Sequence, residues 1–213
     1  MNDFEFGRSD SFGNDEDSVY EEVITGLFGR TKGITVGDVG VSRKCLKTIY
    51  KSMKLKKQVF KKVLEAHNAV LEYGIATGNE RVIVIDIATG ATVDDQTGTS
   101  RRVEFYIPQD YKGDVITIHN HPNSTPFSPK DLYSFNAVKQ TECLIVQCHT
   151  GGVYALIKRS AKKYKLSEKA LQDRFEIIQD SVIYSDKSFR EKGEMFVEEL
   201  SRIFGWDFKK GAD

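Results

Sequence analysis

The stretch VITIHNHPNSTPFSPKDL, residues 115–132, predicts a strand, a turn and the start of a helix in direct succession. Its first half is apolar and β-branched, which is typical of a strand, and Pro122 ends the pairing because proline has no N–H to donate. Ser128 stands where a helix N-cap belongs, with Pro129 at the first helical position and Asp131 at the third. The Asp131 carboxylate is therefore expected to face the end of the strand, where two of the chain's four histidines lie.

The residues before this stretch change from a helical to an extended pattern. Apolar side chains recur at steps of three and four over residues 46–71, which predicts helical structure with a break near Leu55. A β-branched strand is expected at 81–87 and another at 101–107, with a turn at 88–92 after the first.

The residues after the stretch complete the pattern of a mixed domain. The helix that starts at Pro129 is expected to run over 129–140, and residues 143–159 predict a β-hairpin that turns at 150–152. Two further helical patterns cover 167–184 and 188–206. The order helix, strands, helix, hairpin, helices predicts an α/β (α+β) fold with one mixed sheet flanked by helices.

Composition favours a soluble globular protein. The 213 residues carry 31 basic and 31 acidic side chains, so no overall charge points to nucleic acid or to a membrane surface. Three cysteines in no zinc-ribbon spacing suit a reducing compartment, and no apolar run approaches the roughly 20 residues of a membrane-spanning helix. The N-terminus lacks the pattern of a signal peptide, so a cytoplasmic location without membrane partners is expected.

Two histidines two positions apart on a strand predict a metal site. Alternate strand side chains share a face, so His119 and His121 point the same way and can supply two nitrogen ligands. Asp131 adds an oxygen, and three protein ligands with an open fourth position are typical of a catalytic zinc site. The competing interpretation is a strand end followed by a capping box between Ser128 and Asp131, with no metal.

A catalytic zinc site also needs a general base beside the attacking water. The glutamates considered for this role are Glu65, Glu72, Glu80 and Glu104. Glu72 is preferred because LEYGIATG lies where helix gives way to strand and Gly74 permits close packing there, and Glu80 is the second choice.

HNHP followed by SPKD, with EYGIATG upstream, resembles the JAMM (JAB, MPN+) zinc metallopeptidase family over residues 54–159. The HNHP wording is similar to bacterial and phage members, including RadC-type proteins. The five-residue spacer between Pro122 and Ser128 is one residue shorter than is usual in the family. The resemblance implies a curved sheet flanked by helices.

The resemblance also implies a role for each matching residue. His119, His121 and Asp131 would hold Zn²⁺, Glu72 would be the catalytic glutamate, and Ser128 would hydrogen-bond the tetrahedral intermediate. The implied activity is hydrolysis of a peptide or isopeptide bond in a protein or peptide substrate. Two kinds of substrate are consistent with the resemblance: the bond after a ubiquitin-like C-terminal tail, and a processing site in a bacterial or phage system.

The predicted organisation is an acidic disordered tail (1–18), a helical extension (19–53), the JAMM-like domain (54–159) and a C-terminal helical extension (160–213). The alternative function is a noncatalytic zinc-binding module for protein or nucleic acid. Its sequence basis is the stretch from Arg43 to Lys62, which holds nine basic residues and no acid. Oligomeric state is not predicted.

Overall fold

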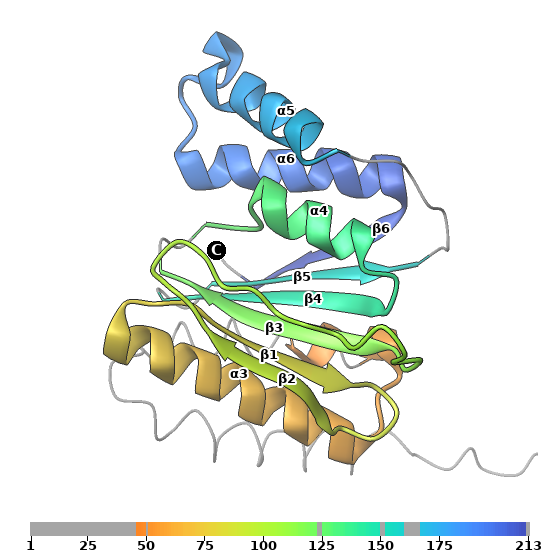
Figure 1. The fold of residues 1–213 in the computed structure, drawn as a ribbon. Coiled ribbons are helices and arrows are strands. Elements are labelled where there is room, and N and C mark those ends of the chain that lie inside the picture. The colour runs from red at the N-terminus through yellow and green to blue at the C-terminus, as the bar shows by residue number, and fades with distance from the viewer. Residues whose placement is uncertain (1–45, 50, 123–124, 150–151, 160–166, 212–213) are drawn as a thin grey trace, which may run out of the picture.

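A mixed six-stranded sheet with helices on both faces organises the residues that the structure describes (Figure 1). The computed structural model describes residues 46–49, 51–122, 125–149, 152–159 and 167–211. The strand order is β2-β1-β3-β4-β5-β6. β3 and β4 pair in parallel, whereas the other neighbouring pairs are antiparallel. The predicted α/β class with one mixed sheet is confirmed.

Most elements lie where the sequence pattern predicts them. The strands are β1 (Arg81–Asp86), β2 (Thr92–Thr97), β3 (Val115–His121), β4 (Thr141–Cys148), β5 (Val153–Lys158) and β6 (Trp206–Lys210). The helices are α3 (Lys57–Thr77), α4 (Pro129–Ala137), α5 (Glu168–Asp180) and α6 (Phe189–Phe204), with a 3₁₀ turn at Val182–Tyr184.

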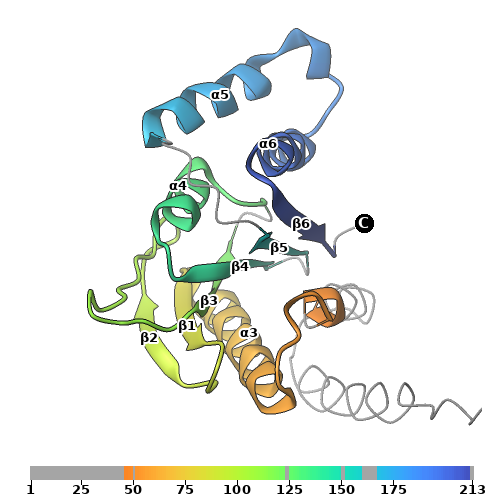
Figure 2. The same ribbon diagram turned by 90° about the vertical axis from the view of Figure 1, so that its right-hand side faces the viewer.

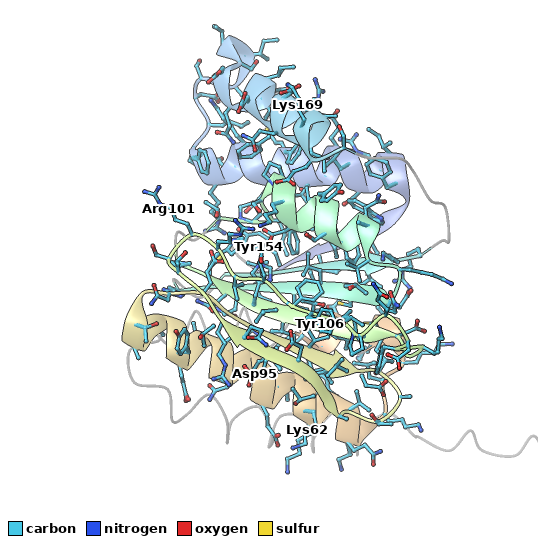
Figure 3. All side chains as sticks on the ribbon, in the orientation of Figure 1. Lys62, Asp95, Arg101, Tyr106, Tyr154 and Lys169 are labelled. Atoms are coloured by element: carbon cyan, nitrogen blue, oxygen red, sulfur yellow. The ribbon has the colours of Figure 1, made fainter. Side chains whose placement is uncertain are left out.

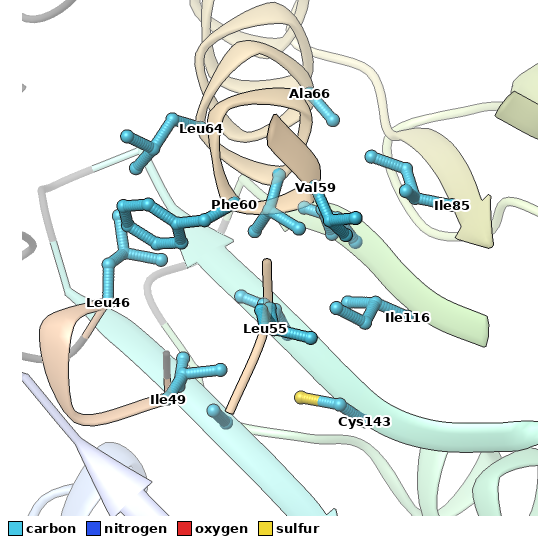
Figure 4. Packing of buried hydrophobic residues seen from close by; sticks show 14 of the residues in the cluster. Leu46, Ile49, Leu55, Val59, Phe60, Leu64, Ala66, Ile85, Ile116 and Cys143 are labelled. Atoms are coloured by element: carbon cyan, nitrogen blue, oxygen red, sulfur yellow. The ribbon is translucent and has the colours of Figure 1, made fainter. Parts of the chain in front are cut away.

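The helical region before the sheet breaks where the sequence predicts it. Helical residues 46–49 and 51–53 are followed by Lys54, whose positive φ of 52° is a left-handed conformation that stops a helix. α3 then begins at Lys57 and lays its apolar face on the sheet, with Leu55 buried in the same cluster (Figure 4). Burial of such a side chain contributes roughly 1.5–3 kcal/mol to folding stability, so packing of Leu55 in the core stabilises the chain at this break.

The other face of the sheet carries two apolar clusters. α4 and α6 pack over β4, β5 and β6, α5 packs on α4 and α6, and Figure 2 shows these helices on the side of the sheet opposite α3. Apolar side chains of the segment 103–111 pack over valines of β1 and β3. Between the two clusters β3 presents Thr117, His119 and His121, all buried. The candidate site therefore lies in the seam between the two apolar clusters of this face.

The prediction of a strand at 101–107 is wrong. Val103, Phe105 and Ile107 alternate inwards and pack on the face of the sheet, but residues 103–107 pair with no strand of the described chain. The sheet instead gains β2 and β6, which the apolar pattern does not predict. β2 has the sequence TVDDQT and pairs with β1 through its backbone, so its side chains carry almost no apolar signal.

The N-terminal tail 1–18, and residues 19–45 of the predicted helical extension, lie outside the described residues. The predicted domain boundaries stay predictions. None of the helices in the described ranges combines the length and the apolar character that crossing a membrane requires.

Candidate metal centre

The two histidines of HNHP converge as the strand alternation predicts. His119 and His121 are 4% and 7% exposed, and their Nε2 atoms lie 3.0 Å apart. β3 is paired on both sides, with His119 opposite Val82 of β1 and beside Val146 of β4. Because a strand held on both edges has little freedom, the spacing of the two rings is fixed by the sheet.

Asp131 reaches the histidines from the first turn of α4. Ser128 is the N-cap and accepts a hydrogen bond from the Asp131 N–H, while the Asp131 carboxylate accepts one from the Ser128 N–H. This capping box fixes the direction of the aspartate side chain. Its Oδ1 lies 3.4 Å from His119 Nε2 and its Oδ2 lies 3.3 Å from His121 Nε2.

The three groups are placed where they could hold one metal ion. Zinc–ligand bonds of about 2.0–2.1 Å at tetrahedral angles separate neighbouring ligand atoms by about 3.3–3.4 Å. The two Nε2 atoms lie 3.0 Å apart, and each lies 3.3–3.4 Å from a different oxygen of Asp131. With one ligand atom from each residue, the three atoms lie within 4.8 Å of one another. The carbonyl of Thr125 lies 3.1 Å from His121 Nδ1, which places the ring proton there and leaves Nε2 as the ligand atom. No other group of three or more potential metal ligands occurs among the described residues.

The electrostatics of the cluster fit a cation as well. Burial raises the pKa of the Asp131 carboxyl, but His119 and His121 outweigh burial and hold this pKa well below its ordinary value. Burial lowers the pKa of His121, but the hydrogen bond and charge of Asp131 outweigh it, with help from Glu80, and the pKa is raised. The carboxylate thus favours positive charge between the rings, which a proton or a metal ion can supply.

Glu80, not Glu72, is the glutamate beside the triad. Glu80 immediately precedes β1, whose Val82 pairs with His119, and it lies close enough to His119, His121 and Asp131 for their charges to shift its pKa. Glu80 is 8% exposed and lines the same hollow as His121 and Asp131. Burial raises the pKa of its carboxyl, the two histidines and a hydrogen bond from the Val103 N–H act against this, and the net shift is upward.

The structure places Glu72 elsewhere. α3 continues through Gly74 to Thr77, so Glu72 stays on the exposed face of the helix, where its carboxylate accepts a hydrogen bond from Asn68 at 2.7 Å. The other two candidates are also engaged at the surface. Glu65 pairs with Lys62, and Glu104 pairs with Arg102 and Lys130.

Ser128 lies at the site, but in the structure its hydroxyl is bonded to Asp131, one of the three candidate metal ligands. Its hydroxyl donates to Asp131 Oδ2 at 2.7 Å, the oxygen that also lies nearest His121. A hydroxyl has one proton, so a hydrogen bond from Ser128 to a substrate oxygen would require this one to break. Orientation of Asp131 is the function that the geometry gives this side chain.

Two hollows meet at the triad. One, of about 570 Å³, lies between residues 103–109 and α4 and reaches His119. The other, of about 640 Å³, is lined by Glu80, His121 and residues of α5 and α6. Val103, Lys130 and Asp131 line both hollows, so the metal centre lies where they join. Neither Val103 nor Lys130 carries a sequence signal for such a position, because it depends on how the loop that holds Val103 packs against α4, which holds Lys130.

A second metal site near the hairpin is not formed by the described residues. Cys143 is buried in the cluster under α3, whereas Cys148 is buried in the cluster under α4 and α6, so the two thiols face opposite sides of the sheet. His149 instead bonds to the side chain of Asn120 at 2.7 Å.

No family model, curated protein or solved structure matches this chain. The assignment of a possible metal site therefore rests on the geometry of His119, His121 and Asp131.

Proposed function

We propose that the chain is a zinc-dependent metallopeptidase or isopeptidase of the JAMM type. One observation carries the proposal: two buried imidazole nitrogens and a carboxylate converge within 3.4 Å of one another at the junction of two hollows. A structural capping box alone does not require two histidine Nε2 atoms to face each other.

The ligand set favours zinc over the common hard cations. Mg²⁺ and Ca²⁺ are bound mainly by oxygen, whereas imidazole nitrogen with one carboxylate suits Zn²⁺. Three protein ligands leave a fourth position for water or substrate, as in catalytic rather than structural zinc sites. When bound, zinc would supply Lewis acidity that polarises the scissile carbonyl and acidifies the attacking water.

The side chains of this chain would handle the proton. Glu80 is proposed to accept a proton from the attacking water on its carboxylate and to deliver it to the leaving nitrogen as the C–N bond breaks. The raised pKa of Glu80 suits this exchange, because a stronger base takes the proton more readily. Val103 holds the carboxylate through its N–H, and Ser128 orients Asp131.

An extended polypeptide suits the surroundings of the site. The segment 103–107 alternates between inward and exposed side chains and belongs to no strand pair of the described chain. Figure 3 shows Tyr106 from this segment in front of the sheet, and its side chain is 64% exposed. The Tyr106 N–H of this segment donates to Asp94, and a substrate strand could pair with its remaining backbone groups in the way that extended peptides pair with a strand. A ubiquitin-like C-terminal tail is one substrate of this kind.

The first experiment measures zinc content and hydrolysis together. Wild type should hold about one zinc per chain and cleave internally quenched peptides or an isopeptide-linked ubiquitin dimer. Glu80→Gln should keep its zinc and lose at least about 10²-fold in kcat, because the base is removed. Glu72→Gln is the matched control and should retain wild-type turnover. Full turnover of Glu80→Gln would show that this carboxylate is not the base.

A noncatalytic module that binds nucleic acid is the second candidate. Exposed lysines gather at the start of α3 and just before it, namely Lys51, Lys54, Lys56, Lys57, Lys61 and Lys62. In Figure 3, Lys62 points away from the sheet. Cations near a helix N-terminus oppose the helix dipole, so this arrangement is not explained by helix stability. Duplex DNA binding that weakens steeply with salt and survives Glu80→Gln would favour this candidate.

A further inference from the structure

The middle residue of HNHP has no part in the metal site, yet it is fully buried. Asn120 is 0% exposed, and its neighbours His119 and His121 point to the opposite face of β3. Its carboxamide lies on the α3 side of the sheet. A buried carboxamide is costly unless its hydrogen bonds are satisfied, so its partners reveal its purpose.

Asn120 holds the backbone on both sides of Glu80. Its Oδ1 accepts a hydrogen bond from the Arg81 N–H at 2.7 Å, and its Nδ2 donates to the Asn79 carbonyl at 2.9 Å. These two bonds span 39 and 41 residues of sequence and enclose one residue, Glu80. On the other side, the Glu80 N–H donates to the Thr99 carbonyl at 2.9 Å, and the Glu80 carbonyl accepts from the Gly98 N–H at 2.8 Å.

The carboxamide is itself held in place from behind. Its Nδ2 also bonds to His149 Nε2 at 2.7 Å, and α3 passes closely over both groups at Gly74. A Cβ at position 74 would lie 2.1 Å from His149 Nε2 and 2.3 Å from Asn120 Nδ2. A larger residue at this point of the helix would have to displace both side chains, and the close packing restricts rotation of the Asn120 carboxamide.

We propose that Asn120 is the positioning residue for Glu80. By fixing the two peptide groups that flank Glu80, it keeps the Glu80 carboxylate beside the His119–His121–Asp131 cluster. The inference rests on the proposed function, in which Glu80 is the base. It also explains why an asparagine stands between the two histidines: one planar group accepts from one peptide and donates to the other.

Val103 offers a reporter that depends on neither metal nor substrate. Its N–H donates to the Glu80 carboxylate, so it loses its acceptor if that carboxylate moves. Amide hydrogen exchange is measured by NMR on the full chain. Asn120→Ala should speed exchange at Val103 by at least about tenfold relative to the amides inside β3 and β4. Glu80→Ala sets the upper limit of this effect.

Two matched variants separate positioning from loss of stability. His149→Ala removes one partner of Asn120 but leaves both bonds that flank Glu80, so exchange at Val103 should stay within about twofold of wild type. Ile118→Val trims a core side chain on the same face of β3 and should change exchange at Val103 only in proportion to the core amides. If Asn120→Ala speeds exchange at Val103 only in proportion to exchange at the core amides, the proposal is overturned.

A measurement on wild type keeps the proposal testable if Asn120→Ala does not fold. The Arg81 amide, whose acceptor is the Asn120 side chain, should exchange as slowly as the interior amides of β1. Fast exchange at Arg81 would mean that the carboxamide does not hold this peptide, and the proposal would fail.

Enzyme kinetics test whether the positioning of Glu80 by Asn120 affects catalysis. Asn120→Ala should lower kcat with little change in KM, and the double variant Asn120→Ala/Glu80→Gln should be no slower than Glu80→Gln alone, because both act through one carboxylate. Additive losses would overturn the positioning role. If wild type hydrolyses none of the peptides, the proposed function fails, and exchange at Val103 still decides whether Asn120 holds Glu80.

Discussion

At the scale of single residues, Ser128 joins a helix cap to a metal ligand. Ser128→Ala removes the side-chain cap of α4 and the hydrogen bond to Asp131 Oδ2. Unfolding free energy should fall by about 1 kcal/mol, and zinc affinity should fall by about 10–100-fold because the ligand loses its orienting partner. Urea unfolding and zinc titration against a competing chelator measure the two effects.

The chain supplies a matched control for this prediction. Ser188 caps α6 through an equivalent capping box with Glu191, outside the triad. Ser188→Ala should cost similar stability and leave zinc affinity unchanged. An equal loss of zinc affinity in both variants would assign the effect of Ser128 to general destabilisation.

The triad should also give the metal-free chain a defined pH dependence. The raised pKa of His121 stabilises the fold below about pH 6.5, and this contribution is lost as pH rises through the folded-state pKa. The lowered pKa of Asp131 stabilises the fold above about pH 4, and this is lost as pH falls through its folded-state pKa. Both contributions are therefore complete between about pH 4 and 6.5.

Urea unfolding with a chelator present checks this window. The stability difference between wild type and Asp131→Asn should be largest near pH 5–6 and shrink as pH rises beyond the raised pKa of His121. A difference that is constant from pH 5 to 9 would show that the carboxylate acts only as a helix cap. Zinc affinity should rise over the same range, because the metal competes with the His121 proton.

The residues of the triad could be predicted because each depends on local geometry. Strand alternation pairs His119 with His121, and a helix cap aims Asp131, so a short stretch of sequence holds the information. Glu80 could not be chosen over Glu72 in this way. Its place depends on the pairing of β1 with β3 and on how far α3 continues past Gly74, and both are tertiary facts.

At the scale of elements, one glycine inside α3 and one just after it have different physical roles. Gly78 ends the helix with a positive φ of 72° and has open space around it, whereas Gly74 lies in mid-helix against His149 and Asn120. Alanine normally stabilises a helix interior by about 1 kcal/mol relative to glycine. Gly74→Ala should reverse that sign, because its Cβ would meet both side chains at less than 2.5 Å.

Thermal and urea unfolding of two variants test the difference. Gly78→Ala should cost about 1 kcal/mol through backbone strain and leave exchange at Val103 unchanged. Gly74→Ala should be more destabilising and should also speed exchange at Val103, because it displaces Asn120. A stabilised Gly74→Ala would contradict the close approach of α3 to the end of β3.

Elements with an apolar period were predictable, and elements held by backbone pairing were not. α3, β3, α4 and the β4–β5 pair each place apolar side chains in a buried cluster, so the spacing of these residues in the sequence predicts the element. β2 contributes mainly backbone hydrogen bonds, and its mostly polar side chains do not show the apolar alternation that predicts a strand. The segment 103–107 has the alternation of a strand because one side packs on the sheet, although it pairs with none.

At the scale of the whole molecule, the metal site joins parts of the fold that the unfolded chain does not hold together. β3 brings the two histidines and α4 brings Asp131, and at the seam between two clusters on this face the histidines are buried and Asp131 is partly buried. A ligand that binds only the native state stabilises it by RT ln(1 + [L]/Kd), about 2.7 kcal/mol when free ligand is 100 times Kd. For a domain of this size that corresponds to a rise in Tm of roughly 5–10 °C.

Zinc should therefore raise the melting temperature, and only when the triad is intact. Differential scanning calorimetry of the chelator-treated chain, with free zinc buffered in steps, should show a Tm that climbs with the logarithm of zinc concentration once Kd is passed. His119→Ala/His121→Ala removes both nitrogen ligands and should show no such climb. An equal climb in that variant would place the binding elsewhere in the chain. A flat Tm in wild type would mean that the folded chain binds no zinc, and the proposed hydrolase would fall with it.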